Sequence, residues 1–218
     1  MDKTHIKICC ISSIDEAKLA INLGASALGL VGHMPSGPGI ITDELISEIA
    51  AFAPKNIDTF LLTSETKVSN ILAHYSKVKT TTIQLVDELT EGTHNQIKLA
   101  LPHVNLVQVL HVLDESSINE AIKVSKYVDT ILLDSGNPNL TTKELGGTGR
   151  VHNWEVSKAI VESVNIPVFL AGGLNPKNAL NAIQKVKPYG LDLCSGVRTN
   201  GNLDENKLTT FFKSINNN

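Results

Sequence analysis

The chain has 218 residues, of which 42% are hydrophobic and 19% charged, and its formal net charge is −3. Disorder requires low hydrophobicity together with high net charge, so this composition predicts a folded protein. No basic block is present of the kind that binds nucleic acid or an anionic membrane, so neither partner is expected. The length suits one α/β domain, because α/β barrels often have about 200–250 residues.

The three cysteines, Cys9, Cys10 and Cys194, form neither a disulfide framework nor a CxxC metal pair. They favour a reducing compartment. The N-terminal segment lacks the pattern of a signal peptide, and no run of 18 apolar residues predicts a membrane span. We therefore expect a cytoplasmic protein. Aromatic residues make up only 4% of the chain, so the core must consist of aliphatic side chains, as in helices packed on buried parallel strands.

Short aliphatic or β-branched runs alternate with segments of helical period, which is typical of repeated βα units. Eight units leave roughly 27 residues each, enough for a single-domain (β/α)₈ TIM barrel over residues 1–218. An open doubly wound sheet uses similar units and remains the alternative. In chain order, the predicted strands are Ile6–Cys10, Ala27–Gly32, Ile57–Leu62, Thr80–Leu85, Val104–Leu110, Val128–Asp134, Pro167–Ala171 and Gly190–Cys194.

Start signals mark several of the predicted helices. Ser13 with Glu16 reads as a capping box before the first helix, and Thr42 before two acidic residues is a suitable N-cap for the second. Asn175-Pro176 supplies an N-cap followed by proline at the first helical position, which predicts the start of the seventh helix.

The first predicted strand combines a cation with a thiol. Side chains alternate between the two faces of a strand, so Lys7 and Cys9 share one face, whereas Ile6, Ile8 and Cys10 share the other. The apolar set should face the helices, which places Lys7 and Cys9 inside the barrel, with Cys9 near the mouth. A nearby cation favours the thiolate, so Cys9 is a candidate base or nucleophile. The alternative role is that of a small buried core residue.

The sixth predicted strand ends at a carboxylate, Asp134, which is a candidate general acid or base at the end of the barrel where function gathers. The alternative is that Asp134 only caps the loop that follows. That loop is the longest connection and is rich in glycine, which fits a mobile flap. Gly147 and Gly149 of this loop are candidates for contacts with a bound substrate.

Paired small residues follow the last two strands, where barrels often hold phosphate. Gly172 and Gly173 come after the seventh strand, and Ser195 and Gly196 come after the eighth, where a short helix should begin. Glycines let a ligand approach the backbone, whose N–H groups bind anions. These four residues are the candidate phosphate site. The alternative is that the glycines serve only tight turns.

Taken in order along nearly the whole chain, several short motifs resemble the phosphoribosylanthranilate isomerases of tryptophan biosynthesis, which are (β/α)₈ barrels of about this length. Each motif alone is weak, and their order makes the resemblance specific. The matching residues are Lys7-Ile8-Cys9, Gly24-Ala25, Ala27-Leu28-Gly29, Leu132-Leu133-Asp134-Ser135, Gly146-Gly147-Thr148-Gly149 with Trp154, Leu170-Ala171-Gly172-Gly173-Leu174-Asn175-Pro176, and Asp192 through Val197.

This resemblance implies an Amadori rearrangement, in which an N-phosphoribosyl aminal opens and isomerises to a 1-deoxy-ketose without a cofactor. Asp134 would be the general acid that protonates the ribose ring oxygen, and Cys9 the base that removes the C2 proton. Lys7 would lie in the substrate site, and the phosphate would sit on the glycines and Ser195 of the last two loops. Coupled proton transfer needs such an acid and base pair.

The chain departs from the family pattern at four places. Cys10 replaces a glycine after the catalytic cysteine, and Gly37-Pro38-Gly39 replaces Ser-Pro-Arg, so that an arginine is lost. Val86-Asp87 replaces His-Gly, and His111 aligns with a further arginine. The first lost arginine would deprive the anthranilate carboxylate of a charge-assisted partner that contributes about 1.5–3 kcal/mol.

Three functions therefore remain open. In the first, His33, His111 or Arg150 supplies the ring-side contact, and phosphoribosylanthranilate stays the substrate. In the second, the barrel isomerises another phosphorylated amino-sugar. In the third, it binds a phosphorylated metabolite without catalysis, which gives no purpose to a thiol base and an acid. No metal is expected, because His33, Asp87 and His111 lack a recurring ligand spacing. Monomer and homodimer both remain open.

Overall fold

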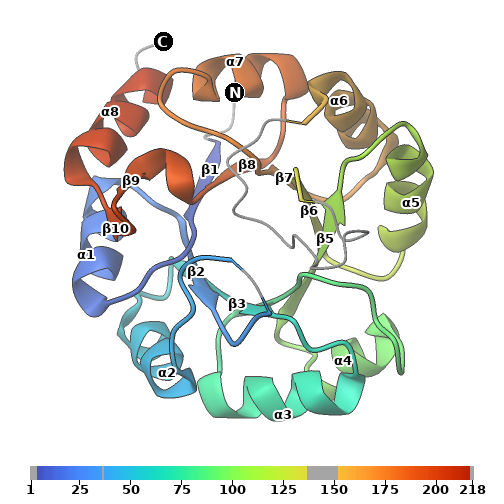
Figure 1. Cartoon of the computed structure of the whole chain (residues 1–218). Helices are drawn as coiled ribbons and strands as arrows, with labels where there is room; N and C mark the ends of the chain where they lie inside the picture. Colours follow the sequence, from blue (N-terminus) through green and yellow to red (C-terminus); the bar gives the residue numbers. More distant parts are fainter. Residues whose placement is uncertain (1–3, 36, 137–151, 217–218) are drawn as a thin grey trace.

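The computed structural model describes residues 4–35, 37–136 and 152–216. Its eight parallel strands close into a barrel in the order in which they occur along the chain (Figure 1). All eight predicted strands are thus confirmed, and the open doubly wound sheet is wrong. The strands are β1 (His5–Ile8), β2 (Ala27–Val31), β3 (Asp58–Thr63), β4 (Thr82–Leu85), β5 (Asn105–His111), β6 (Thr130–Asp134), β7 (Val168–Leu170) and β8 (Gly190–Leu193).

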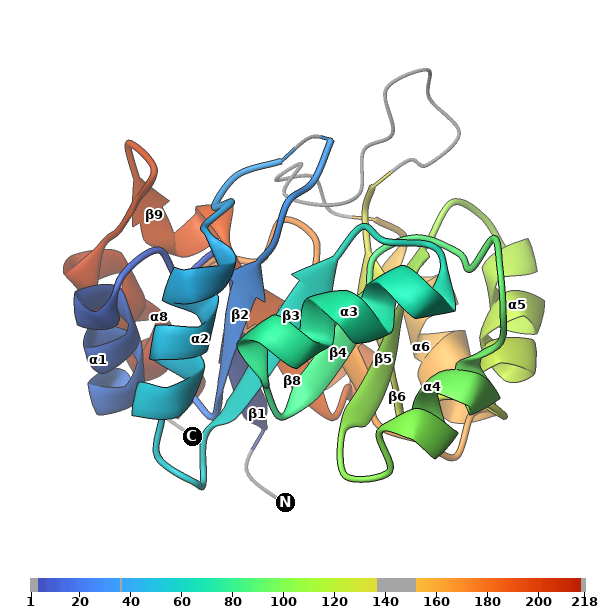
Figure 2. The ribbon, with the colours of Figure 1, turned by 90° about the horizontal axis from the view of Figure 1, so that it is seen from below.

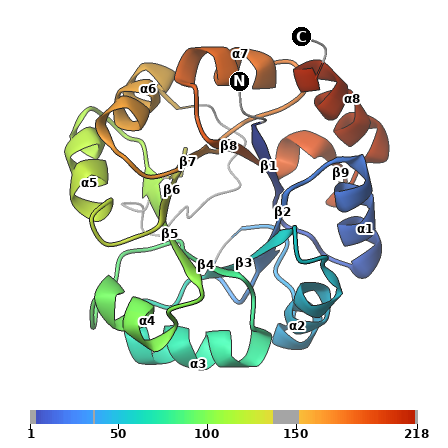
Figure 3. The ribbon, with the colours of Figure 1, turned by 180° about the vertical axis from the view of Figure 1, so that it is seen from behind.

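Helices form a ring around the barrel, which is plain from both ends (Figures 1 and 3). A short 3-10 helix, η1 (Ser195–Val197), follows β8 and leads into a hairpin of β9 (Arg198–Thr199) and β10 (Asn202–Leu203), which rises beside the mouth (Figure 2). The helices are α1 (Ile14–Leu23), α2 (Asp43–Phe52), α3 (Val68–Val78), α4 (His94–Ala100), α5 (Ser116–Val124), α6 (Trp154–Ser163), α7 (Ala179–Val186) and α8 (Glu205–Asn216).

The first two helices begin where the capping residues predict. The Ser13 hydroxyl accepts a hydrogen bond from the Glu16 N–H at 3.1 Å, and the Thr42 hydroxyl caps α2 in the same way. The Glu16 carboxylate turns back to the N–H of Ser12, at 2.9 Å, and so the second bond of the box forms one residue earlier than a standard capping box.

The seventh helix starts later than the sequence predicts. The Asn175 side chain accepts from the Lys177 N–H at 2.9 Å and so closes a turn over residues 175–178, and regular helix begins only at Ala179. Asparagine stabilises such a turn as readily as a helix N-cap, because the same side-chain oxygen binds an N–H two residues on in both cases.

Two separate cores hold the barrel together. The outer core packs aliphatic strand residues such as Ile8, Leu61 and Leu133, all fully buried, against the surrounding helices. The inner core fills the barrel with the alternate side chains, and its Phe60 and Phe169 rings meet edge to face at 6.0 Å. The mouth therefore lies above a packed interior, as in other barrels of this type. Among the described residues, no helix has both the length and the apolar character needed to cross a bilayer.

Candidate active site

A buried ion pair lies below the mouth. Lys7 is fully buried, and its Nζ lies 2.9 Å from Oδ2 of Asp192, on the neighbouring strand β8, and 5.1 Å from the centre of the Phe60 ring. Burial alone would lower the pKa of Lys7, but the charge of Asp192 and the hydrogen bond with it oppose this, and the pKa is raised. The interior thus keeps one fixed positive charge close to Cys9.

We expect Asp192→Asn to reduce the free energy of unfolding by about 3–5 kcal/mol, because it leaves the Lys7 ammonium buried without a counter-charge. Urea denaturation at neutral pH measures this loss. Asp15→Asn is the matched control, because Asp15 pairs with Lys18 on the exposed surface, and the change there should stay below about 1 kcal/mol. Equal losses of unfolding free energy in the two variants would show that the buried ion pair contributes no more to stability than the exposed one.

Cys9 lies just past the end of β1, and its backbone N–H donates to the Leu193 carbonyl at 2.7 Å. The side chain belongs to the inner core and is 6% exposed. It leans toward β2, where a Cβ at Gly29 would lie only 2.8 Å from Sγ. Glycine at position 29 therefore makes the space that the thiol occupies.

Asp134 ends β6 on the inner face and is 8% exposed. Its Oδ1 accepts hydrogen bonds from the backbone N–H of Ser135 at 2.7 Å and from the Ser135 hydroxyl at 3.5 Å. Burial, assisted by the charge of Asp192, raises the pKa of Asp134 to about 6. The carboxyl does hold the first residue of the loop, but its high pKa also leaves it able to exchange a proton near neutrality.

The orientation of Cys10 differs from the sequence prediction. Cys10 was expected to face the helices, but it lies in the inner core with Cys9. The reason is that β1 ends at Ile8, and Cys10 adopts a left-handed backbone conformation with φ of 63°, so alternation along the strand no longer applies. Its side chain packs on Gly39, where a Cβ would lie 2.5 Å from the Cβ of Cys10.

The loops after β7 and β8 bring the predicted phosphate residues together. Gly172 and Gly173 have φ of +80° and +63°, values that favour glycine. Within the described part of the chain, their backbone N–H groups donate to no protein acceptor. Gly196 packs directly on the other loop, because a Cβ there would lie 1.9 Å from the Leu174 carbonyl oxygen. Ser195 begins the 3-10 helix beside it.

His111 occupies the mouth on the other side of Asp134. It ends β5 and pairs in register with Asp134 on β6. Both ring nitrogens are buried, and neither makes a hydrogen bond of good geometry to a described residue, although the Val86 backbone and the Asp87 carboxylate lie close enough to act on the ring in the direction of a higher pKa. Burial outweighs both and lowers the pKa of His111, so the ring is neutral near pH 7 and can donate or accept one hydrogen bond. The adjoining inner wall is apolar and includes Val31, Leu62 and Val86.

The remaining predicted contact residues are either exposed or outside the described part of the chain. His33 is exposed on the loop after β2, and its carbonyl accepts a hydrogen bond from the Ser64 hydroxyl at 2.8 Å. Gly147, Gly149 and Arg150, with the expected flap, lie outside the described residues. In the described segments, no three His, Cys, Asp or Glu side chains lie together as a metal site would require.

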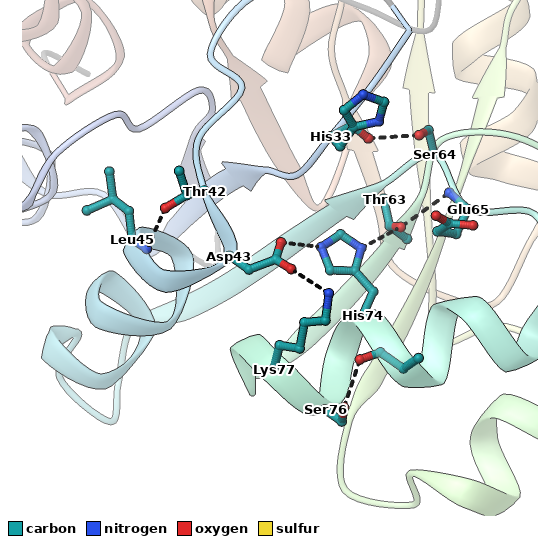
Figure 4. A network of polar contacts seen from close by, with 11 residues as sticks. His33, Thr42, Asp43, Leu45, Thr63, Ser64, Glu65, His74, Ser76 and Lys77 are labelled. Atoms are coloured by element: carbon teal, nitrogen blue, oxygen red, sulfur yellow. Dashed lines mark hydrogen bonds and ion pairs between the residues drawn. The ribbon is translucent and has the colours of Figure 1, made fainter.

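A histidine network that the sequence did not reveal supports the loop after β2 (Figure 4). His74 of α3 contacts the Thr63 hydroxyl at 3.0 Å through Nδ1 and the Asp43 carboxylate at 3.1 Å through Nε2, and Lys77 also pairs with Asp43. The ring packs so closely on Gly32 that a Cβ there would lie 2.5 Å from it. Because these partners are 11 or more residues apart, no local pattern could have shown them.

His152 is a second residue that the sequence analysis missed. Nε2 of His152 shares a hydrogen bond with the Ser157 hydroxyl at 2.7 Å, and that hydroxyl also lies 3.3 Å from the Asn153 carbonyl. Nδ1 lies 3.0 Å from where a Cβ on Gly172 would be, and burial lowers the pKa of His152 to about 4. The position of His152 in the sequence, between the glycine-rich segment and Trp154, is the feature that could have indicated a role in the site.

The mouth therefore combines a thiol, a carboxyl that titrates near neutrality, a buried cation and unpaired backbone N–H groups. A thiol and a protonated carboxyl can move protons on a bound molecule in both directions. The N–H groups of Gly172 and Gly173 suit an anion. This set fits acid–base chemistry on a small anionic substrate.

Comparison with known proteins adds to this picture. Residues 6–214 match the family model of N-(5'-phosphoribosyl)anthranilate isomerase. The N-(5'-phosphoribosyl)anthranilate isomerase of Nostoc punctiforme is 33% identical over 213 residues, which cover 97% of this chain and 98% of that protein. Isomerase 2 of Methanosarcina mazei is 32% identical over 209 residues and covers 95% of this chain and 92% of its own length.

A solved phosphoribosyl anthranilate isomerase, bound to reduced 1-(o-carboxyphenylamino)-1-deoxyribulose 5-phosphate, has a similar fold. The TM-score is 0.78 and the sequence identity 22%, and the match covers 99% of this chain and all of that one.

Proposed function

The chain belongs to the N-(5'-phosphoribosyl)anthranilate isomerase family, and from this membership we propose that it catalyses the Amadori rearrangement of N-(5'-phosphoribosyl)anthranilate in tryptophan biosynthesis. The product is the 1-deoxyribulose 5-phosphate. The observation that carries the proposal is the position of Asp134, a buried carboxyl on the inner face of the mouth whose pKa is raised to about 6. An acid with that pKa is half protonated at about pH 6 and keeps a protonated fraction of about a tenth at pH 7, so it can act as a general acid.

We assign the chemistry as follows. Asp134 donates its proton to the ribose ring oxygen, the bond between that oxygen and C1 breaks, and a Schiff base forms. Cys9, as thiolate, removes the proton from C2, and the electron pair of that C–H bond neutralises the Schiff base to give an enolamine. The enolamine then tautomerises to the ketone. The buried ammonium of Lys7 supplies a positive charge beneath Cys9 while these charges move.

The two ends of the substrate are assigned to opposite sides of the mouth. The unpaired N–H groups of Gly172 and Gly173, with Ser195 and Gly196, support a phosphate site after β7 and β8. The apolar wall near β2, β3 and β4 supports a site for the aromatic ring. The isomerase solved with the reduced deoxyribulose phosphate binds a ligand with both groups.

His111 is our first choice for the contact with the anthranilate carboxylate, because its ring is buried at the mouth and neither nitrogen makes a hydrogen bond of good geometry to a described residue. We expect His111→Ala to raise KM about 10- to 100-fold and to leave kcat within about threefold, since one hydrogen bond to a charged group contributes about 1.5–3 kcal/mol. Steady-state kinetics measure both constants. His103→Ala, an exposed histidine at the other end of β5, is the control. An unchanged KM in His111→Ala would move the contact to His33 or Arg150.

Direct assay with phosphoribosylanthranilate tests the function, in the absence of any added metal or cofactor. Turnover, together with growth of a tryptophan auxotroph that lacks this isomerase, is the expected result. Turnover only of another phosphorylated amino-sugar would establish a changed substrate. Phosphate-ester binding without turnover of either would establish a non-catalytic barrel.

We further propose that the protein acts in the cytoplasm as one domain, as a monomer or a homodimer, because its three unpaired cysteines suit a reducing compartment. Cell fractionation and light scattering test these two points.

A further inference from the structure

Cys10 adopts a left-handed backbone conformation at a buried position, where its carbonyl accepts a hydrogen bond from the Arg198 guanidinium. Three other non-glycine residues of the described segments have positive φ. Lys79 and Lys187 follow helix ends, and Asn200 lies in the turn between β9 and β10, places where a left-handed residue is common. Cys10 is instead a buried residue at the mouth, and the left-handed conformation turns its thiol inward. Strain of this kind gathers at functional sites.

The inward thiol meets a second cysteine from the neighbouring strand. β1 and β8 are paired in register up to Ile8 and Leu193, so Cys194, which directly follows β8, comes beside Cys9 and next to Cys10, and it packs against the inner core that holds both. Neighbouring strands lie about 4.8 Å apart, and a disulfide needs Cα atoms about 4.4–6.8 Å apart, so the end of β8 is within reach of the end of β1. The Cys10 thiol lies close enough to the Cys194 thiol for each to shift the pKa of the other, and it also neighbours Cys9.

The two thiols differ in exposure and in acidity. Cys194 is partly exposed, whereas Cys10 is buried. The neighbouring Cys10 thiol lowers the pKa of Cys194, and the nearby Arg198 guanidinium adds to this, whereas Cys194, Cys9 and burial raise the pKa of Cys10. Arg198 is held by Glu16 through two nitrogens, at 3.0 and 2.9 Å, so its charge is fixed in place. An accessible acidic thiol beside a buried partner is typical of a redox-sensitive pair.

We propose that Cys10 and Cys194 form a reversible disulfide when the protein meets a hydroperoxide. The Cys194 thiolate attacks a peroxide oxygen, the O–O bond breaks, and Cys194 becomes a sulfenic acid while the peroxide leaves as water or an alcohol. The Cys10 sulfur then attacks the sulfenic sulfur, an S–S bond forms, and the hydroxyl leaves as water with the Cys10 proton. Two thiols are oxidised, and one peroxide is reduced.

The disulfide would alter the mouth of the barrel. Cys194 directly precedes Ser195 and Gly196, and Cys10 directly follows Cys9. A covalent link between the two positions fixes the end of β1 to the loop after β8, so movements of Cys9 and of the proposed phosphate loop become tied together. Activity should fall on oxidation and return when a dithiol reduces the link.

Peptide mapping tests the link without any reference to activity, so its failure is distinct from failure of the proposed function. Purified protein is treated with hydrogen peroxide, alkylated, digested with trypsin without reduction and analysed by mass spectrometry. No Lys or Arg separates Cys9 from Cys10, so the two share one peptide. The Cys9→Ser variant resolves this, because Cys10 is then the only thiol in it. The expected result is a peptide that joins Cys10 to Cys194 in wild type and in Cys9→Ser.

Cys10→Gly is the matched control, because glycine accepts the left-handed backbone at position 10 and the fold should persist. This variant should keep its starting activity and form no linked peptide after treatment with peroxide. Cys194→Ser should likewise form no link. Absence of the linked peptide in wild type and Cys9→Ser, or a link from Cys194 to Cys9 instead, overturns the proposal.

Discussion

Cys9→Ser is expected to lower kcat/KM by about 10²- to 10⁴-fold, the usual contribution of a positioned general base, while circular dichroism and the thermal midpoint stay close to wild type. Serine fits the space beside Gly29, since it is slightly smaller than cysteine. Its hydroxyl, however, is not ionised at neutral pH and so cannot remove the C2 proton as a thiolate does. Steady-state kinetics with phosphoribosylanthranilate measure the loss.

The control for Cys9 lies next to it in the chain. Cys10→Gly removes a thiol from the same inner core, so it separates loss of the base from a general disturbance of the mouth. Exchange of the substrate's C2 proton with solvent offers a second readout. If Cys9 removes that proton, the exchange should be lost in Cys9→Ser. If Cys9→Ser turned over substrate within about threefold of wild type, Cys9 would have no part in the proton transfer.

Asp134→Asn is expected to lower kcat/KM by a similar factor, about 10²- to 10⁴-fold, because an amide has no proton to give to the ribose ring oxygen. In the wild type, the acid must be protonated, and its pKa is raised to about 6. The pH profile of kcat/KM should therefore fall as pH rises above about 6, until another step limits the rate. The control is Asp58→Asn. It removes an exposed carboxylate at the start of β3, at the opposite end of the barrel from the mouth, and should leave the pH profile of kcat/KM unchanged.

Asp134→Asn should also be more stable than the wild type at neutral pH. The folded pKa of Asp134 lies above the unfolded value, so ionisation in the folded state is penalised, and two pKa units correspond to about 3 kcal/mol. Below pH 4 the carboxyl is protonated in both states, and the two proteins should be equally stable. The gap should open between pH 4 and 6 and then stay constant. A gap that closes as pH rises would contradict the burial of an acid at this position.

Much of the fold could be predicted from the sequence, because it follows from local periodicity. Buried strands show as aliphatic runs, and all eight were recognised. The start of α7 was misplaced, because Asn175 stabilises a turn as well as it caps a helix. Cys10 was assigned to the wrong face for a similar reason: alternation holds only within a strand, and a left-handed residue beyond its end leaves no trace in the sequence.

A site residue could be predicted from the sequence where its own position at the end of a strand is enough to identify it. Asp134 and Cys9 both stand out as unusual residues at the ends of aliphatic runs. The network around His74 could not be found in this way, because its partners come from three different elements. His152 was missed because its closeness to Gly172 depends on how two loops meet, and the sequence does not encode that meeting locally.

The close packing of Cys10 on Gly39 links two of the departures from the family pattern. The family has glycine where this chain has Cys10, and arginine where this chain has Gly39. The larger side chain therefore stands on one loop in the family and on the neighbouring loop in this chain. An arginine at position 39 would collide with the Cys10 side chain, and φ of +81° there disfavours any side chain. Because a Cβ at position 39 would also lie 2.9 Å from the Cα of Cys10, loss of the Cys10 side chain alone would not admit the arginine, and the backbone of the loop would have to shift as well. The residues at positions 10 and 39 are therefore sterically coupled through the backbone of both loops.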